Sequence, residues 1–413
     1  MATPASTGRG ESAGTAPESR LSLLKEREFV TLWMLGALAS IIRWLEMLAI
    51  GVYVFDVTGS PFLVAVMTVA RMAPLALAGM LSGVVAEYVN RRTLLIAGFG
   101  LMAVQSAGLA LWSTLTPVPI WALIVASFAN GLFWTTDFSA RRTIMAEVCG
   151  VRRIGIAMSL DSITSNGTRM LGPALGGLLL QLIGLDGAFI LGIFVYLIGT
   201  GLAFSLVRPP DGSGDDQGIL ASMLEGLRYI RTNRALTATL MITIVFNVWG
   251  FPMTSMVPVI GKDFLQLSAF PVGLLMSAEG VGATIAALLI TAYSQPRIYK
   301  RLYFFGVFLY LDMILLFAYT GWPWLSGAWL LILGLGGAAF ASMQAALVLL
   351  YTKPEYRSRV MGVLAVCIGT GPLGFIHLGL LADWVGAPLA LVIMALEGIL
   401  ALLIVAIIWP EVD

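Results

Sequence analysis

Of the charged side chains that interrupt long apolar stretches of this 413-residue sequence, five are best placed to do chemistry: Arg43, Glu46, Arg71, Arg169 and Glu279. An ionisable group in a lipid-like medium costs about 2.5–3.5 kcal/mol and usually marks a solute path, a proton path or a buried ion pair. The sequence contains no GxxxxGK[ST] loop, so direct use of ATP is not expected. These residues predict binding and proton chemistry, not covalent catalysis, and we expect no enzyme activity, cofactor or metal.

Three of these residues fall at similar depths. Arg43 and Glu46 are three residues apart, which places them near one helical face, and Arg71 comes from the next apolar segment, which runs back. Counted from the segment ends at 55 and 61, all three lie nine to twelve residues deep, within about one helical turn of each other. One carboxylate facing two guanidiniums could form an anion-attracting or proton-sensitive site, or a buried ion pair that fixes two helices together. The sequence leaves both open.

Glu279 has no basic neighbour in the sequence. An unpaired buried carboxylate holds its proton more tightly than one in water, which would let Glu279 bind and release protons near neutral pH. The alternative is a salt bridge with Arg169 or another distant arginine. Arg169 itself could contact the solute or hold its helix to a neighbour.

Several amides and tryptophans could complete a cavity. Aromatic faces with a few amides suit a bulky, partly apolar organic molecule, although tryptophans near helix ends often belong to the interfacial belt instead. The candidates are Asn130, Asn247, Gln344, Trp44, Trp134 and Trp249. For His377, Asp312 and Glu397 we expect helix packing and structural roles.

The elements that carry these residues are predicted to be membrane-spanning helices. Hydrophobic residues make up 59% of the chain and charged residues 11%, against about 25% charged residues in soluble domains. A helix needs about 20 apolar residues to cross the hydrocarbon core. Runs of that length occur at 29–55, 61–86, 93–115, 118–139, 157–183, 187–207, 235–258, 270–292, 302–321, 324–350, 360–382 and 387–409. We therefore expect an all-α integral membrane protein of twelve transmembrane helices.

The basic residues set the expected orientation. With the N-terminus inside, twenty of the 24 lysines and arginines fall in the tail and cytoplasmic loops, one (Lys262) falls outside, and three lie within helices. The positive-inside rule then places both termini in the cytoplasm of an inner (cell) membrane. A net charge of +1 gives no reason to expect a nucleic-acid partner.

The chain divides near its middle. We expect a disordered cytoplasmic tail at 1–24, a six-helix half at 25–207, a cytoplasmic connector with an amphipathic helix at 208–234, and a second six-helix half at 235–413. Two such halves around a central path are typical of secondary transporters.

Five short motifs support a family resemblance. The stretch GVVAEYVNRR, from Gly83 to Arg92, resembles the loop signature of the major facilitator superfamily. DVTGSPF (56–62), LGPALGG (171–177), EGLRYIRTNRAL (225–236) and YRSRVMG (356–362) look like the branch of that superfamily containing the enterobactin exporter and drug efflux proteins. The resemblance implies the major facilitator fold, with Glu87, Arg91 and Arg92 forming a cytoplasmic gate network. Asp137 and Arg141 are expected to join that network.

The loop signature departs from the family pattern at three positions. Glu87 stands where aspartate is usual, Tyr88 where arginine is frequent, and Asn90 where glycine is frequent. Asparagine tolerates a left-handed backbone better than most residues, so the turn can survive.

LGPALGG resembles a helix motif associated with antiporters. Gly172, Gly176 and Gly177 allow close helix approach, and Pro173 removes a backbone hydrogen bond so that the helix can bend. The alternative is ordinary packing of small residues.

Together these features predict a monomeric secondary transporter in membrane lipid. It would export small organic molecules, siderophore-like or drug-like, with protons as the coupling ion. Uptake or lysophospholipid transport is the competing transport function, and a non-transporting membrane scaffold or sensor is an alternative of another class.

Overall fold

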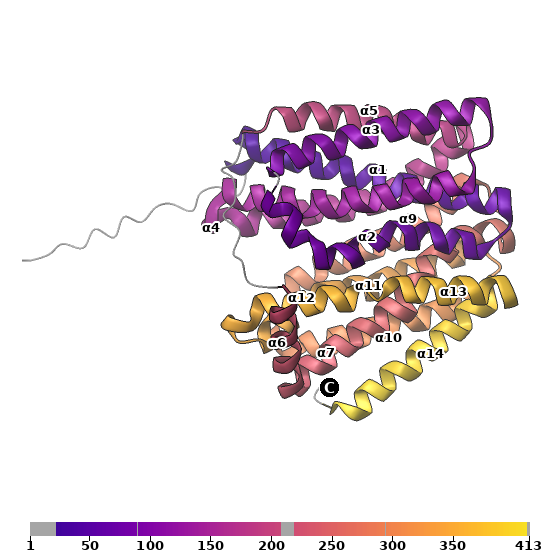
Figure 1. Ribbon diagram of the computed structural model, residues 1–413. Coiled ribbons are helices and arrows are strands. Elements are labelled where there is room, and N and C mark those ends of the chain that lie inside the picture. Colours follow the sequence, from indigo (N-terminus) through magenta and orange to yellow (C-terminus); the bar gives the residue numbers. More distant parts are fainter. Residues whose placement is uncertain (1–21, 89, 208–218, 294, 411–413) are drawn as a thin grey trace, which may run out of the picture.

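The computed structural model describes residues 22–88, 90–207, 219–293 and 295–410, and these residues contain helices and no β-strand (Figure 1). The helices are α1 (Arg27–Thr58), α2 (Pro61–Tyr88), α3 (Arg91–Leu115), α4 (Ile120–Ile183), α5 (Leu185–Phe204), α6 (Ile219–Thr232), α7 (Arg234–Val245), α8 (Met256–Val259), α9 (Ala269–Tyr293), α10 (Tyr299–Ala318), α11 (Pro323–Tyr351), α12 (Arg357–Ile368), α13 (Gly371–Val385) and α14 (Ala387–Ile408). Short 3-10 turns occupy Ser22–Lys25, Phe251–Ser255, Pro296–Ile298 and Pro354–Tyr356, and π-helical turns occupy Phe246–Gly250 and Ile260–Phe264.

Within the described residues, nine helical stretches are long and apolar enough to cross a membrane. They cover α1, α3, α5, the continuous stretch Arg234–Phe264, α9, α10, α11, the stretch Arg359–Val385 and α14. Large apolar side chains such as Leu101, Val104 and Phe194 are exposed on the outside of the assembly. Exposed apolar surface on this scale is what a lipid-facing protein presents.

Helix α4 contains the two segments predicted at 118–139 and 157–183, and its 64 residues are helical on both sides of a break at Gly150. Gly150 has φ 64° and ψ 172°, a backbone conformation that side-chain-bearing residues rarely adopt. Twenty residues of straight helix would span about 30 Å, yet Arg141 Nη1 lies 2.6 Å from Asp161 Oδ1. The chain therefore reverses at Gly150, giving a first arm (120–149) and a second arm (151–183).

The loop before α3 is built differently from the expectation. Asn90 has φ −55°, so it does not use a left-handed backbone. Its side chain instead accepts a hydrogen bond from the backbone N–H of Arg92 at 3.0 Å and caps the start of α3. The asparagine is used for its carbonyl oxygen, not for its backbone freedom.

The helices form two bundles that lie side by side: an N-terminal bundle (α1–α5) and a C-terminal bundle (α7–α14) (Figure 1). The bundles meet mainly where α4 packs on α9 and where α2 packs on α13. The arginine-rich turns that precede α3, α10 and α12 lie at one end, which we call the basic end. The opposite end carries the turns at Gly59, Gly184 and Gly386, all with positive φ.

Hydrogen bonds and ion pairs join the two bundles toward the opposite end. Lys262 pairs with Asp56 at 3.0 Å, and Asp383 accepts hydrogen bonds from Ser60 and from the backbone N–H of Phe62. The structure thus holds its two bundles together at the end opposite the basic end.

Connector helix α6 packs on the C-terminal bundle at the basic end. Glu225 pairs with Arg359 at 2.9 Å, and the rings of Tyr229 and Tyr356 stack at 4.3 Å between centroids. The side chains of residues 219–224, which carry part of the predicted apolar stripe, lie outside the described part of the structure.

Candidate functional site

A cavity of about 130 Å³ lies in the N-terminal bundle, between mid-depth and the basic end. Both arms of α4, together with α1 and α5, supply its walls. Its lining residues are Gly36, Ala39, Ser40, Arg43, Asn130, Phe133, Trp134, Asp137, Phe138, Arg141, Arg142, Asp161, Ser165 and Tyr196. The wall combines aromatic rings with charged groups, so it can accept a partly apolar organic solute that carries polar groups.

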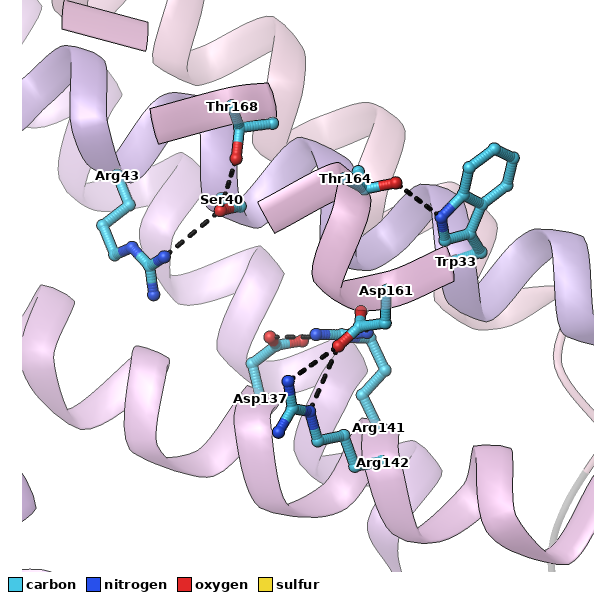
Figure 2. Close-up of polar contacts among 9 residues, drawn as sticks. All are labelled: Trp33, Ser40, Arg43, Asp137, Arg141, Arg142, Asp161, Thr164 and Thr168. Carbon is cyan, nitrogen blue, oxygen red and sulfur yellow. Dashed lines mark hydrogen bonds and ion pairs between the residues drawn. The ribbon is translucent and has the colours of Figure 1, made fainter. Parts of the chain in front are cut away.

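Four charged side chains form a buried cluster on the cavity wall (Figure 2). Asp161 Oδ1 accepts from Arg141 Nη1 at 2.6 Å, and Asp161 Oδ2 accepts from Arg142 Nη2 at 2.9 Å. Asp137 Oδ2 lies 3.4 Å from Arg141 Nε. A Cβ at Gly36 would lie 2.4 Å from Arg141 Nη1, so glycine leaves the space that this guanidinium occupies. The cluster ties the two arms of α4 together beside α1.

Asp137 and Arg141 were expected to join Arg91 and Arg92 in a gate network, and the structure separates them. Arg91 pairs with Glu147, and Arg92 donates to the carbonyl of Phe204 at 2.6 Å. Asp137 and Arg141 point instead into the cavity wall, where they meet Asp161 of the second arm.

The other two members of that predicted network, Gly83 and Glu87, cannot be placed in it. Their side-chain surroundings lie outside the described part of the structure.

Arg43 presents a guanidinium to the cavity. Its Nη2 donates to Ser40 Oγ at 3.2 Å, and Ser40 Oγ also accepts from Thr168 Oγ1 at 2.7 Å (Figure 2). The guanidinium lies 4.8 Å from the Trp134 ring centroid and 5.5 Å from that of Trp44. Among the described residues, no carboxylate forms an ion pair with Arg43. Two aromatic rings lie near this cation, and apart from the bond to Ser40 its N–H groups can donate to a ligand in the cavity.

The predicted trio of Arg43, Glu46 and Arg71 is only partly formed. Glu46 Oε2 lies 3.8 Å from Arg71 Nη2, and the two residues are 2% and 5% exposed. Arg71 Nη1 donates to the backbone carbonyl of Arg43 at 2.8 Å, whereas the Arg43 guanidinium turns toward Ser40. The expectation of one carboxylate facing two guanidiniums is therefore wrong, because Arg43 points one turn closer to the basic end.

Tyr196 links this pair to the cavity. Its hydroxyl lies 3.3 Å from Glu46 Oε2 and 3.1 Å from Asn130 Oδ1, and its single proton can be donated to either oxygen. Asn130 and Tyr196 both line the cavity, so Glu46 stands directly behind the wall.

Glu279 is paired with Arg169, which confirms the alternative that the sequence left open and not the isolated carboxylate. Its Oε1 accepts from Arg169 Nη2, and the hydroxyl of Tyr310 lies 3.5 Å from the same oxygen. Arg169 belongs to the second arm of α4 and Glu279 to α9, so this ion pair crosses between the bundles at mid-depth. Arg169 also lies 5.3 Å from the ring centroid of Trp44, so one indole lies near two guanidiniums.

The glycines of LGPALGG lie on the two faces of the second arm. A Cβ at Gly172 would lie 2.6 Å from Cβ of Trp44, and one at Gly176 would lie 2.6 Å from the carbonyl oxygen of Leu45. Gly177 makes the equivalent close approach to α9, with 2.4 Å to the carbonyl oxygen of Ala269.

Pro173 lies on the α9 side of the same arm. A Cβ at Gly273 would lie 2.4 Å from its carbonyl oxygen. The motif thus places one arm in backbone contact with both α1 of its own bundle and α9 of the other.

A set of hydrogen-bonded polar side chains is buried inside the C-terminal bundle. Gln344 Nε2 donates to Thr243 Oγ1 at 3.3 Å, and Asn247 Nδ2 donates to the Thr243 carbonyl at 2.8 Å. Tyr303 lies 2.7 Å from Thr243 Oγ1. Asn247 and Gln344 are therefore brought together, but they do not line the cavity of the N-terminal bundle.

Trp249 was a candidate for the cavity wall, and the structure places it elsewhere. Its indole N–H donates to Glu397 of α14 at 3.0 Å. This contact lies on the side of the C-terminal bundle that α14 covers.

Sequence reasoning did not single out Arg142, Tyr196 or the buried Asp161 as residues of the cavity. The available signal was the spacing of Arg141 and Arg142 from Asp161 across Gly150. Asp161 follows Arg141 by 20 residues and Arg142 by 19, and Gly150 lies between them. A helical reversal at that glycine brings the acid and the two bases together.

Comparisons with known proteins agree on a transporter family. Residues 18–412 match the transmembrane secretion effector family. The chain is 23% identical to macrolide efflux protein A of Streptococcus pyogenes over 374 residues, 87% of this chain and 90% of the relative. It is 26% identical to the multidrug efflux pump Tap of Mycolicibacterium fortuitum over 380 residues, 86% and 88% of the two chains.

Solved structures share the fold. The inward-facing, unoccupied bacterial homologue of the human lysosomal transporter Spinster superposes with a TM-score of 0.72 at 13% identity, covering 96% of this chain and 99% of that one. The apolar helices and these matches make the protein a multi-pass membrane protein. The chain belongs to the transmembrane secretion effector family of major facilitator transporters.

Proposed function

We propose that this protein is a proton-coupled secondary transporter that exports small organic molecules by alternating access. The observation that carries the proposal is the Arg169–Glu279 ion pair, which crosses the bundles at mid-depth beside a charged, aromatic cavity. A carrier of this kind rocks two bundles about a central path, and contacts between the bundles must break in each cycle. An ion pair that a proton can neutralise is a contact of that kind.

We propose that the chain crosses the membrane twelve times in two halves, 25–207 and 235–413. A tail at 1–24 precedes the first half, and a connector at 208–234 joins the two. Beyond the nine stretches above, the two arms of α4 and helix α2 supply the three further crossings. The basic end would face the cytoplasm of the inner membrane, in keeping with the positive-inside rule. The cavity would then be reached from the cytoplasm while Lys262–Asp56 and its neighbours keep the opposite end closed.

Single-cysteine labelling tests this arrangement. Cysteines placed at Asn90 and at Glu355 are expected to be protected from an impermeant thiol reagent applied to whole cells and labelled in inverted vesicles. A cysteine at Gln266 is expected to show the reverse pattern, because it lies at the opposite end. Labelling of positions 90 and 355 from different sides of the membrane would contradict the two-half arrangement. Both native cysteines, Cys149 and Cys367, are buried and are replaced by serine first.

The proposed solutes are drug-like or siderophore-like molecules, in keeping with the efflux relatives and with the staphyloferrin A transporter of Staphylococcus aureus, which is 19% identical over 274 residues, 65% of this chain and 68% of that relative. Arg43 is the proposed contact for an oxyanion of the solute, and Trp134 and Phe133 are the proposed contacts for its apolar part. Asn130 and Tyr196 would supply hydrogen bonds.

Reconstituted flux tests the function itself. Purified protein in proteoliposomes is expected to move a macrolide, a siderophore or ethidium against its concentration gradient when a pH gradient is imposed, and to stop when a protonophore is added. A solute panel that moves equally in protein-free liposomes would contradict transport. Solute movement that continues in the presence of the protonophore but requires a sodium gradient would contradict proton coupling, while transport itself would stand.

A further inference from the structure

A second polar site lies on the C-terminal bundle, away from the cavity. Glu397 Oε2 accepts a hydrogen bond from the indole N–H of Trp249 at 3.0 Å and lies 3.0 Å from His377 Nε2. We call these three residues the Glu397 triad. They come from α14, from the π-helical turn Phe246–Gly250 and from α13, which converge there. π-Helical turns occur frequently at functional sites.

The triad is open to lipid at mid-membrane depth. Glu397 is ten residues from the start of α14, about 15 Å along the helix, and the side chains of Glu397 and His377 are 42% and 44% exposed. Exposed leucines surround them, including Leu373, Leu380 and Leu400. A charged group within a span normally faces the bundle interior or a water-filled cavity because exposure to hydrocarbon costs about 2.5–3.5 kcal/mol. A carboxylate on the lipid-facing side therefore needs a partner.

In the neutral tautomer that donates from Nε2 to Glu397, the open edges of the triad accept hydrogen bonds. When His377 donates from Nε2, its Nδ1 is a bare acceptor, and Glu397 Oε1 retains its lone pairs. Among the described residues, no lysine or arginine pairs with Glu397. The complementary ligand must bring N–H donors and a positive charge, and the surrounding leucines favour an apolar chain.

We propose that the Glu397 triad is a membrane-facing binding site for amphiphilic primary amines dissolved in the bilayer. The ammonium group would donate to Glu397 Oε1 and to His377 Nδ1, while the alkyl chain lies along α13 and α14 against Leu380 and Leu400. The site lies outside the cavity of the N-terminal bundle. Binding at the site therefore does not depend on the proposed transport cycle.

A second copy of the chain would not satisfy the triad. A twofold interface brings the same patch of both copies together. The N–H donors of that patch, on Trp249 and on His377 Nε2, already serve Glu397 of their own copy. The leftover acceptors would stay unpaired, so a small cationic donor fits the site better than a symmetric partner does.

Equilibrium binding of radiolabelled dodecylamine to the native protein in nanodiscs of zwitterionic lipid tests the site. Binding is expected to be saturable, and Glu397→Gln is expected to weaken it at least about tenfold, because the carboxylate provides the only formal charge. Unlabelled dodecanol, which has the same chain without the charge, is expected to compete poorly. Dodecyltrimethylammonium, a cation without N–H donors, is expected to compete less well than dodecylamine.

Two matched variants keep the test decisive. Asp312→Asn removes another carboxylate of the C-terminal bundle and is expected to bind dodecylamine as the native protein does. Trp249→Phe removes a donor but keeps the carboxylate, so it is expected to retain most of the affinity. Equal binding by native protein and Glu397→Gln overturns the proposal, as does equal competition by dodecanol. A dimer by light scattering that dissociates in Glu397→Gln would assign the site to a second copy instead.

Discussion

Glu279→Gln is expected to abolish uphill transport driven by a pH gradient while leaving downhill exchange of solute in place. Glutamine cannot take up and release the proton that would open the ion pair, and it leaves the Arg169 guanidinium uncompensated between the bundles. Breaking a buried ion pair costs about 3–5 kcal/mol, and each 1.4 kcal/mol is a factor of ten. Since Arg169 is partly exposed, the lower limit applies, so the conformation held by this pair should become about 100-fold less favourable, and accumulation driven by the pH gradient should be lost.

The surroundings of Glu279 support this expectation. Arg169 faces it from α4 and the Tyr310 hydroxyl faces it from α10, while α11 contributes the backbone at Gly334. Arg169 is the one charged partner of Glu279 among the described residues, so loss or gain of a proton at Glu279 changes the net charge of the bundle interface by one.

The charge-swapped pair Arg169→Glu with Glu279→Arg provides the control. It restores opposite charges across the interface and is expected to recover part of the coupled flux, whereas either single change is not. The measurement is solute accumulation in proteoliposomes at a fixed imposed pH difference. Native-like accumulation by Glu279→Gln would remove this residue from proton coupling.

Asp161→Asn is expected to destabilise the protein by about 3–5 kcal/mol. Asp161 is buried and accepts from two guanidiniums, so the substitution leaves Arg142 without its ion-pair partner and Arg141 with only the longer contact to Asp137. The two arms of α4 would then lose the interaction that holds them together below the turn at Gly150. The unfolding midpoint in detergent, followed by tryptophan fluorescence, is the measurement.

Glu147→Gln is the matched control for the loss of stability expected in Asp161→Asn. Glu147 also pairs with an arginine near the basic end, but its side chain is largely exposed, and exposed pairs contribute about 0–1 kcal/mol. A midpoint for Asp161→Asn equal to that of Glu147→Gln would show that the cluster does not stabilise the turn.

The sequence predicts most of the fold because lipid-facing helices must be apolar along their whole length. The apolar runs and the positions of the arginines were sufficient for the all-helical architecture, and the five short motifs were sufficient for the family. Two features were not accessible. The two segments and the reversal between them were predicted, but not that helix continues from both sides up to Gly150, where the non-helical backbone lies.

Pairing between distant residues was the second inaccessible feature. Arg169 and Glu279 are 110 residues apart, and nothing local distinguishes a lone carboxylate from one whose partner arrives from another bundle. The same limit explains why the direction of the Arg43 side chain was not predicted: Glu46, three residues away, was expected to face it. The direction of a long side chain depends on rings from other helices, here that of Trp134.

The indole of Trp44 couples the cavity electrostatically to the Arg169–Glu279 ion pair. Its ring centroid lies 5.5 Å from Arg43, which lines the cavity, and 5.3 Å from Arg169, which pairs with Glu279. A solute that draws Arg43 off the ring changes the field felt by Arg169, and neutralising Glu279 changes the field felt by Arg43. By thermodynamic linkage, whatever factor the proton applies to solute affinity, the solute applies to proton affinity.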